Sequence, residues 1–402
     1  MNTYLLLNSL AGGGAERVAV NLFKRLEFDK LFLLERDVKY EVPEEKLVFL
    51  SPHTNKTNPI YKTLFIPLYA FRLSRHLTKK DIVLSMLERA NYVNIISALI
   101  TGHKSVISVR MSQASGRSKW HPYNLLNKLL YPKADLIVVV SKSIKKELER
   151  NYRVSPEKIR VIYNPLYFDE IQAKKTEPLR EYEAIFKSPV LITAGRLTKQ
   201  KGQWYLLRVF KALKEDMPHL KLVLLGDGEL KEYLADLSER LALKTFVWDR
   251  SKLSENFDVY FLGFQKNPFK FIARAELFVF PSLWEGFPNA LVEAMACGVP
   301  VVSSDCKSGP REILAPNTDF EYQTKAPEFA SYGVLMPPFE VKFKGAKEPL
   351  EEKELMWVDV IKRLLKDKNL RESYAQKATE RAKEFDIVNI IKEWKEILGV
   401  WV

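Results

Sequence analysis

The chain of 402 residues contains little cysteine and no long apolar run. Its two cysteines, Cys297 and Cys306, provide neither a disulfide framework nor the spacing of a metal site, so we expect reduced thiols. No apolar stretch approaches the roughly 20 residues that span a bilayer. Residues 1–10 lack a basic region and lead directly into a glycine-rich loop, which indicates a first β-strand rather than a signal peptide.

Acidic side chains are scarce in the first half of the chain. Residues 1–180 contain 30 Lys and Arg against 17 Asp and Glu, whereas residues 181–402 contain 33 of each. Within the first half, residues 51–134 hold 13 basic side chains and only two acidic ones, Asp81 and Glu88. Such a charge suits anionic lipid, phosphate groups or nucleic acid, and solubility alone is the alternative. No nucleic-acid-binding motif is present, so we expect no nucleic-acid partner.

Strand and helix patterns alternate along the chain in two blocks. The first begins with a strand at residues 3–8 and a helix at 16–26, and the second begins with a strand at 190–194. Repeated βα units with apolar strands predict an α/β fold of two doubly wound, Rossmann-like domains that face a cleft. We expect a first domain over residues 1–178 and a second over 188–385, with 166–187 resembling a linker. We expect residues 386–402 to form a last helix, which either packs on the second domain or crosses back to the first.

Residues 281–300 contain the most informative motif. Two carboxylates, Glu285 and Glu293, flank a turn in which Asn289 is the expected N-cap of a helix. The three amides after Asn289 would then be free to bind an anion. Carboxylates around a phosphate site suit a nucleoside-diphosphate sugar. Carboxylates that only stabilise a helix terminus are the alternative, but they leave the turn itself unexplained.

Two glycine-rich loops each follow a strand and precede a helix. Residues 195–202 place Arg196 and Lys201 at the carboxyl end of a sheet, where two cations suit a diphosphate leaving group. Solvated loop lysines are the alternative, and they fit Lys199 better than Lys201. The loop with Gly12–Gly14 matches no dinucleotide or P-loop motif. It indicates either a backbone that comes close to a phosphate or a tight structural turn.

Taken together, these segments carry a family resemblance. The pair Glu285 and Glu293, with residues 195–202, 226–229 and 12–17, resembles the retaining glycosyltransferases of the two-Rossmann GT-B type in family four. The resemblance covers nearly the whole chain in order. Residues 309–314, together with Ser141, are most similar to bacterial enzymes that extend undecaprenyl-diphosphate-linked oligosaccharides.

The resemblance implies a role for each matching position. Glu285 would hold the donor sugar's hydroxyls, Glu293 the ribose hydroxyls, and the main chain around Phe264 the base. The donor diphosphate would be bound by the turn and by two cations, with catalysis assigned to Arg196, Lys201 and Glu285. The other donor-binding positions would be Gly13, Gly14, Gly286, Phe287, Asn289, Ala290 and Leu291. Glu16 and Arg17 would lie near the acceptor.

One position departs from the family pattern. Many relatives carry a histidine at the end of a first-domain strand, where this chain has Arg110, and His103 lies at the wrong end of that strand. No protein base is therefore expected. The resemblance then implies that the leaving diphosphate takes the acceptor proton. No D-x-D motif is present, so neither a metal nor another cofactor is expected.

The basic first half suggests where the acceptor binds. Arg72, Arg75 and Lys79 have helical spacing opposite an apolar stripe. A second group, including Arg110 and Lys128, mixes cations with interfacial aromatics; its members are Arg110, Arg117, Lys119, Trp120, Lys128, Tyr131 and Lys133. Solvated cations are the alternative for both groups. We hypothesise that the first domain docks on the cytoplasmic leaflet of the cell membrane.

These observations predict an enzyme that transfers a hexosyl group, with retention, from a UDP-sugar to a polyprenyl-diphosphate-linked glycan. An N-acetylhexosamine such as GalNAc is one alternative for the sugar. A transferase for lipopolysaccharide core or capsule is the alternative within enzymes. A basic nucleic-acid-binding protein and a catalytically inactive scaffold are alternatives from other classes.

Overall fold

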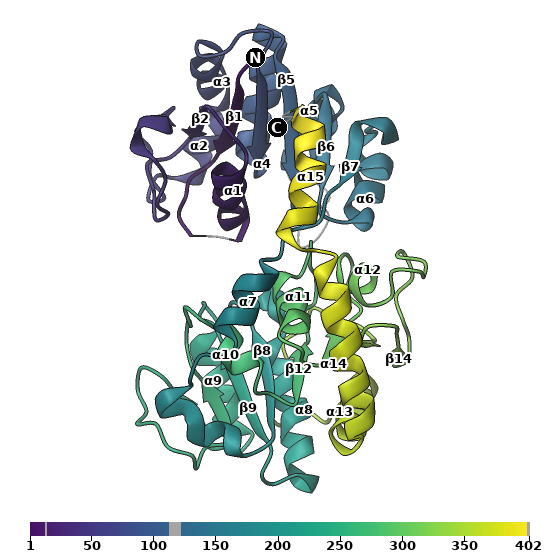
Figure 1. The fold of residues 1–402 in the computed structure, drawn as a ribbon. Coiled ribbons are helices and arrows are strands. Elements are labelled where there is room, and N and C mark those ends of the chain that lie inside the picture. The colour runs from purple at the N-terminus through teal and green to yellow at the C-terminus, as the bar shows by residue number, and fades with distance from the viewer. Residues whose placement is uncertain (13, 112–121, 400–402) are drawn as a thin grey trace. The chain divides into compact units, whose positions relative to one another are not determined.

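The computed structural model describes residues 1–12, 14–111 and 122–399. The chain divides into two compact units, residues 1–165 with 387–402 (unit 1) and residues 166–386 (unit 2) (Figure 1). Residues 166–178, which we had placed in the first domain, therefore fall in unit 2. The physical reason is helix α7 (Phe168–Lys174), which packs on α10 (Phe269–Ile272) and α11 (Asn289–Ala296) of that unit.

Unit 1 is built on a seven-stranded parallel sheet in the order β3-β2-β1-β4-β5-β6-β7. Its strands are β1 Thr3–Leu7, β2 Lys30–Leu33, β3 Leu47–Phe49, β4 Ile82–Met86, β5 Lys104–Val109, β6 Leu136–Val139 and β7 Ile159–Val161. All five residues of β1 and of β4 are buried, as a sheet covered on both faces requires.

The helices of unit 1 connect these strands. They are α1 Gly14–Arg25, α2 Pro59–Leu64, α3 Ile66–Ser74, α4 Glu88–Thr101, α5 Pro122–Leu130 and α6 Lys142–Tyr152, with α15 Ile387–Leu398 at the end of the chain. Helix α1 buries Val18 and Leu22 on one face, as the spacing predicts. Figure 1 shows α15 (yellow) beside this sheet, and its Ile390, Trp394 and Leu398 belong to the same apolar core.

Unit 2 is built on an eight-stranded sheet in the order β10-β11-β9-β8-β12-β13-β15-β14, parallel except for the β14–β15 pair. Its strands are β8 Val190–Ala194, β9 Lys221–Leu225, β10 Thr245–Val247, β11 Val259–Phe261, β12 Leu277–Phe280, β13 Val301–Ser304, β14 Glu328–Phe329 and β15 Val334–Met336. Besides α7, α10 and α11, its helices are α8 Gln203–Asp216, α9 Lys231–Arg240, α12 Pro310–Leu314, α13 Glu352–Lys366 and α14 Lys368–Lys383. The two doubly wound α/β units confirm the predicted fold class.

The core of unit 2 joins α8 to the C-terminal segment. The ring of Tyr205 stacks on that of Phe339 with centroids 4.1 Å apart, and the Arg208 guanidinium donates to the buried Glu354 carboxylate at 2.7 Å. These contacts fix the N-terminal end of α8, which follows the loop of residues 195–202. Among the described residues, no helix combines the length and apolarity needed to cross a membrane.

Candidate active site in unit 2

The loop between β8 and α8 is held against the segment that follows β12. Gly202 has a φ of 62°, and a Cβ atom there would lie 2.7 Å from the carbonyl oxygen of Pro281, so the position favours glycine twice over. The Leu283 amide donates to the carbonyl of Gln200 at 2.8 Å. The first cationic loop and the first glutamate of the motif are thereby brought together.

Lys201 and Glu285 form a direct ion pair. Lys201 Nζ lies 2.6 Å from Glu285 Oε1, and the two side chains are only 18% and 6% exposed. The same ammonium lies 4.9 Å from the centre of the Phe280 ring, the last residue of β12. Because the pair is shielded from water, its attraction is stronger than on an open surface. The structure thus joins two of the three predicted catalytic residues.

Gln200 completes the environment of this carboxylate. Its side-chain amide donates to Glu285 Oε2 at 3.2 Å and to the carbonyl of Trp284 at 2.9 Å. Both oxygens of Glu285 therefore have donors from one short 3₁₀ turn, Lys199–Lys201. Gln200 is not among the residues that the sequence predicts for this site. An uncharged side chain between two lysines does not by itself indicate a site. Only its position in the glycine-rich loop could have pointed to it.

The loop after β9 supports the other cation. A Cβ atom on Gly226 would lie 2.0 Å from the carbonyl oxygen of Gly195, so the two loops touch through their main chains. The Leu197 amide donates to the carbonyl of Asp227 at 3.0 Å. Between these contacts, the Arg196 side chain is exposed. It is therefore available to an anionic ligand at the carboxyl edge of the sheet.

The start of α11 differs from the prediction. Asn289 is the first helical residue and not the N-cap; that position belongs to Pro288, whose ring cannot provide a side-chain acceptor. The amides of Leu291 and Val292 both donate to the Pro288 carbonyl, at 3.0 and 3.4 Å, and the Asn289 amide donates to that of Phe287. Two of the three amides expected to be free, those of Leu291 and Val292, therefore already have a partner, and a phosphate would have to share them.

The segment that follows β13 (Val301–Ser304) packs against the turn between the two glutamates. The buried Ser308 hydroxyl donates to the carbonyl of Gly286 at 2.9 Å. Gly309 has a φ of 95°, and a Cβ atom there would lie 2.4 Å from Pro288 Cδ. Gly286 and Phe287 are buried, whereas Glu293 and Ala290 are half-buried. Residues 308–309 therefore position the turn. The sequence alone does not indicate this role.

The motif at 309–314 also has a structural function. Arg311 Nη2 lies 2.7 Å from Asp305 and 2.6 Å from Glu328, and both carboxylates accept hydrogen bonds from the guanidinium. Burial raises the pKa of Asp305 despite its arginine partner. This network fixes α12 to the sheet. The Arg311 guanidinium is used in these contacts and not in binding a ligand.

Phe264 follows β11 of the same sheet and is 79% exposed, next to Gly263, which has a φ of 69°. Both cysteines are buried and free. Burial, with a smaller effect of the Glu285 carboxylate, raises the pKa of the Cys306 thiol well above its ordinary value. The thiol beside the site is therefore neutral.

The residues predicted at the start of unit 1 are two glycines expected to bind the donor and two charged residues expected near the acceptor. Gly13 lies outside the described residues, and Gly14 opens α1. Glu16 is half-buried and Arg17 is exposed on the first turns of that helix. Arg17 is close enough to Tyr40 that its charge opposes the rise in the tyrosine's pKa caused by burial.

The two basic groups of unit 1 differ in exposure. Arg72, Arg75 and Lys79 are all exposed, although the Arg72 guanidinium donates to the carbonyl of Leu50 at 2.7 Å, so part of its hydrogen-bonding capacity is used internally. Arg110 directs its guanidinium to Asn164 and Ser108, and burial lowers its pKa to about 10. It is still a cation at neutral pH, but it is not part of an exposed basic surface.

The second group is only partly described. Arg117, Lys119 and Trp120 lie outside the described residues. Tyr131 is fully buried, so it is not the interfacial aromatic that we expected. His103 is also buried and hydrogen-bonds through its two ring nitrogens to Asn94 and Thr101.

No group of three or more His, Cys, Asp or Glu side chains within residues 1–12, 14–111 and 122–399 is arranged to hold a metal ion.

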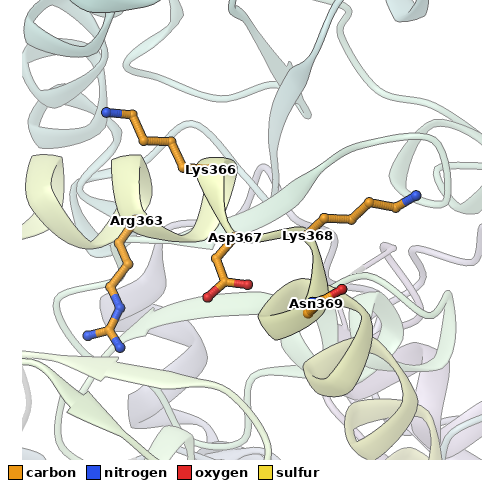
Figure 2. A pocket seen from close by; sticks show the side chains of 5 residues that line it. All are labelled: Arg363, Lys366, Asp367, Lys368 and Asn369. Atoms are coloured by element: carbon orange, nitrogen blue, oxygen red, sulfur yellow. The ribbon is translucent and has the colours of Figure 1, made fainter.

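A cavity lies at the junction of α13 and α14, lined by Arg363, Lys366, Asp367, Lys368 and Asn369. Figure 2 shows the side chains of Lys366 and Lys368 pointing away from each other. Asp367 caps α14 by accepting from the Leu370 amide at 2.9 Å. This cavity contains none of the predicted site residues.

Comparisons with known proteins define the class. Residues 12–169 match the family model described as Glycosyltransferase Family 4, and residues 188–331 match that described as Glycosyl transferases group 1. The fold resembles the Anabaena protein HepE crystallised with UDP, with a TM-score of 0.76, 20% identity and 100% of both chains covered. The protein is a GT-B glycosyltransferase.

Two relatives match over nearly their full length. An uncharacterized glycosyltransferase of Methanocaldococcus jannaschii is 36% identical, over 92% of this chain and 93% of its own. The N-acetylgalactosamine-N,N'-diacetylbacillosaminyl-diphospho-undecaprenol 4-alpha-N-acetylgalactosaminyltransferase of Campylobacter jejuni is 33% identical, over 98% of this chain and 99% of its own. The chain therefore belongs to glycosyltransferase family four, as the resemblance of its motifs implied.

Proposed function

We propose that this glycosyltransferase moves a hexosyl group from a UDP-sugar to a polyprenyl-diphosphate-linked oligosaccharide, with retention of configuration. The observation that carries the acceptor class is the 33% identity, over 98% of the chain, to a relative named for transfer of N-acetylgalactosamine to such a diphospho-undecaprenol glycan. The same relative makes N-acetylgalactosamine the first sugar to test. The complex of HepE with UDP supports UDP as the carrier.

The site in unit 2 suits the donor half of this reaction. The bond between the anomeric carbon and the diphosphate breaks, a bond from an acceptor hydroxyl to the same carbon forms, and the acceptor proton passes to the leaving diphosphate. Lys201 and the exposed Arg196 supply positive charge where negative charge grows. Glu285, oriented by Lys201 and Gln200, holds the sugar hydroxyls, and Glu293 holds the ribose.

The transfer on this proposal needs neither a metal nor a protein base. A His103 imidazole cannot serve as base, because it is buried and bonded at both nitrogens. The positive charge of Lys201 and Arg196 takes the place that a divalent cation has in metal-dependent transferases. Turnover measured in excess EDTA should equal turnover without it.

Unit 1 would take the acceptor on the cytoplasmic face of the membrane. Its basic excess, with Arg75 and Lys79 exposed, suits a lipid diphosphate and anionic headgroups. Arg110 directly follows β5 and Arg17 lies in the first turns of α1, so both would be on the side of the sheet from which an acceptor hydroxyl is presented.

A screen of UDP-sugars against polyprenyl-diphosphate-linked acceptors of graded length, read by UDP release, tests the proposal. We expect one UDP-sugar to be used with a lipid-linked acceptor and not with lipopolysaccharide core. Turnover with the core acceptor alone would contradict the acceptor class. Turnover with only a non-uridine donor would contradict the carrier.

A further inference from the structure

Large apolar side chains are exposed in one part of unit 1. In α2 and α3, Ile60 and Leu64 are each 68% exposed, Tyr61 57% and Phe71 55%. Phe65 and Leu68 are also exposed. A soluble monomer rarely leaves so many large apolar side chains in one short segment uncovered, and such patches mark interaction sites.

The exposed residues follow a helical spacing. Ile60 and Leu64 are four residues apart in α2, and Leu68 and Phe71 are three apart in α3, so each pair shares one face of its helix. The opposite face is also apolar, because Ile66, Tyr69, Ala70 and Leu73 are buried in unit 1. A helix that is apolar on both faces is ordinarily covered on both, so the outward face, apart from the exposed Arg72, lacks a cover that its composition requires.

The polar side chain of α2 points the other way. Lys62 is 5% exposed, and its ammonium lies 2.7 Å from Glu35 Oε2. The second oxygen of Glu35 accepts from the Arg89 guanidinium. Burial of a charged pair has a desolvation cost that only this arrangement offsets, so the orientation of α2 is fixed. The apolar face is therefore exposed because the lysine is anchored inside, and not because the helix is loosely packed.

Exposed cations flank the two helices along the chain. Lys56 precedes α2, and Arg75, Lys79 and Lys80 follow α3, all exposed. The nearby Asp81 is 3% exposed and accepts from the amides of Asn2 and Thr78, so its charge is directed inward. Uncovered apolar side chains bordered by cations match the two layers of an anionic bilayer surface.

Helix α5 repeats this composition. The Tyr123 hydroxyl lies 2.9 Å from Thr63 Oγ1, which joins the first turn of α5 to α2. On α5, Leu125 is 63% and Leu129 56% exposed, with the exposed Lys128 between them. The two leucines are four residues apart and so share one face of the helix.

We propose that the outer face of α2 and α3, together with Leu125 and Leu129 of α5, inserts into an anionic lipid bilayer. The apolar side chains enter the boundary between headgroups and acyl chains, and the flanking cations contact the phosphates. This surface deepens the proposed function, on which it rests for the choice of a bilayer over a protein partner. Binding to lipid itself requires neither donor nor acceptor.

Flotation of the full-length protein with vesicles tests the surface. The wild type should float with vesicles of 70% phosphatidylcholine and 30% phosphatidylglycerol and at least tenfold less with phosphatidylcholine alone. The triple variant Leu64→Gln/Leu68→Gln/Phe71→Gln should partition at least tenfold less than the wild type. Leu355→Gln, which changes an exposed leucine of α13, is the matched control and should float as the wild type.

Two further measurements separate the alternatives. Unchanged circular dichroism of the triple variant will show that it folds, and sedimentation velocity will give the oligomeric state. Unchanged flotation of the folded triple variant would overturn the proposal. So would a wild-type dimer that the same substitutions dissociate, because a second copy would then be the cover.

Failure of this surface can be distinguished from failure of the proposed function. The triple variant should retain turnover on a short-chain acceptor in detergent and lose it on an acceptor in vesicles. Flotation that depends on Leu64, Leu68 and Phe71, with no transfer to any lipid-linked acceptor, would reject the proposed function and leave the membrane surface intact.

Discussion

At the scale of single residues, the ion pair between Lys201 and Glu285 joins stability to chemistry. Lys201→Ala would leave a buried carboxylate unpaired, which costs about 3–5 kcal/mol of unfolding free energy. It would also remove a cation from the leaving diphosphate, so we expect kcat to fall about 100-fold or more. Thermal unfolding and UDP release measure the two effects separately.

The double variant Lys201→Met/Glu285→Gln distinguishes them. It removes both charges, so the melting temperature should return towards that of the wild type while turnover stays lost. Wild-type turnover by folded Lys201→Ala would show that the lysine has no role in transfer.

Gln200 should act as a positioning residue. Gln200→Ala removes the hydrogen bond to Glu285 Oε2 but leaves the ion pair, so a loss of about tenfold in kcat/KM is expected, about 1.4 kcal/mol. If Glu285 holds sugar hydroxyls, the loss should be smaller for a donor that lacks one of them. Lys199→Ala, in the same turn, is the control and should leave kcat/KM within about twofold. Equal losses with both donors would indicate a purely structural role.

The residue types of this site were predictable at this scale, but their contacts were not. Arg196, Lys201 and Glu285 could be selected because cations and carboxylates near glycine turns have few structural reasons to be there. Their pairing could not be predicted, because 84 residues separate Lys201 from Glu285 and the contact depends on how two loops meet. Asn289 was assigned the cap on its general preference, whereas the preceding Pro288 already provides the acceptor carbonyl.

At the scale of elements, α15 is part of the core of unit 1. Trp394 is 1% exposed among Ile390, Leu398 and the residues of the sheet. We expect Trp394→Ala to lower the unfolding free energy of unit 1 by about 3–5 kcal/mol. Lys392→Ala, on the exposed face of the same helix, should change it by less than about 0.5 kcal/mol. Denaturant unfolding measures both, and an equal, small effect would show that α15 does not stabilise unit 1.

The loop before β5 should make the stability of unit 1 sensitive to pH. Burial lowers the pKa of His103 to about 4, below the 6.5 expected in the unfolded chain. The folded state therefore favours the neutral imidazole, and the contribution of this preference to the unfolding free energy is fully present above pH 6.5. It is lost as pH falls towards 4, by about 3 kcal/mol in total.

Melting temperatures between pH 7 and 4.5 provide the measurement. The fall should be smaller in His103→Gln, which has no proton to take up at this position. A pH dependence of the same size in both proteins would assign the effect to other groups.

The sequence patterns predict these elements unevenly. The central strands of both sheets and the amphipathic α1 follow from buried apolar runs and 3.6-residue periodicity. The short strands β3, β10, β14 and β15 were not predicted, and neither β3 nor β14 is fully buried. Helix α7 was hidden in residues expected to be a linker, because its charged residues give little periodicity and its stability comes from packing on α10 and α11. The destination of α15 required tertiary contacts that its own sequence does not specify.

At the scale of the whole molecule, the two units divide the proposed work. Unit 2 contains the ion-paired site expected for the donor, and unit 1 carries the basic excess and the exposed apolar face of α2 and α3. The charge asymmetry was visible in the sequence. The exposed apolar face was not visible in the sequence. Apolar side chains in a helix are expected to be buried, and only the structure shows which of them face away from the core.

The anomeric configuration of the product tests the central claim most directly. The protein would be given UDP-N-acetylgalactosamine, whose sugar is α-linked, with a polyprenyl-diphosphate-linked acceptor, and the new linkage would be assigned by nuclear magnetic resonance. The account predicts an α-linked product, formed in the presence of EDTA and lost in Lys201→Ala. A β-linked product, or no transfer from any UDP-sugar to a lipid-linked acceptor, would contradict it.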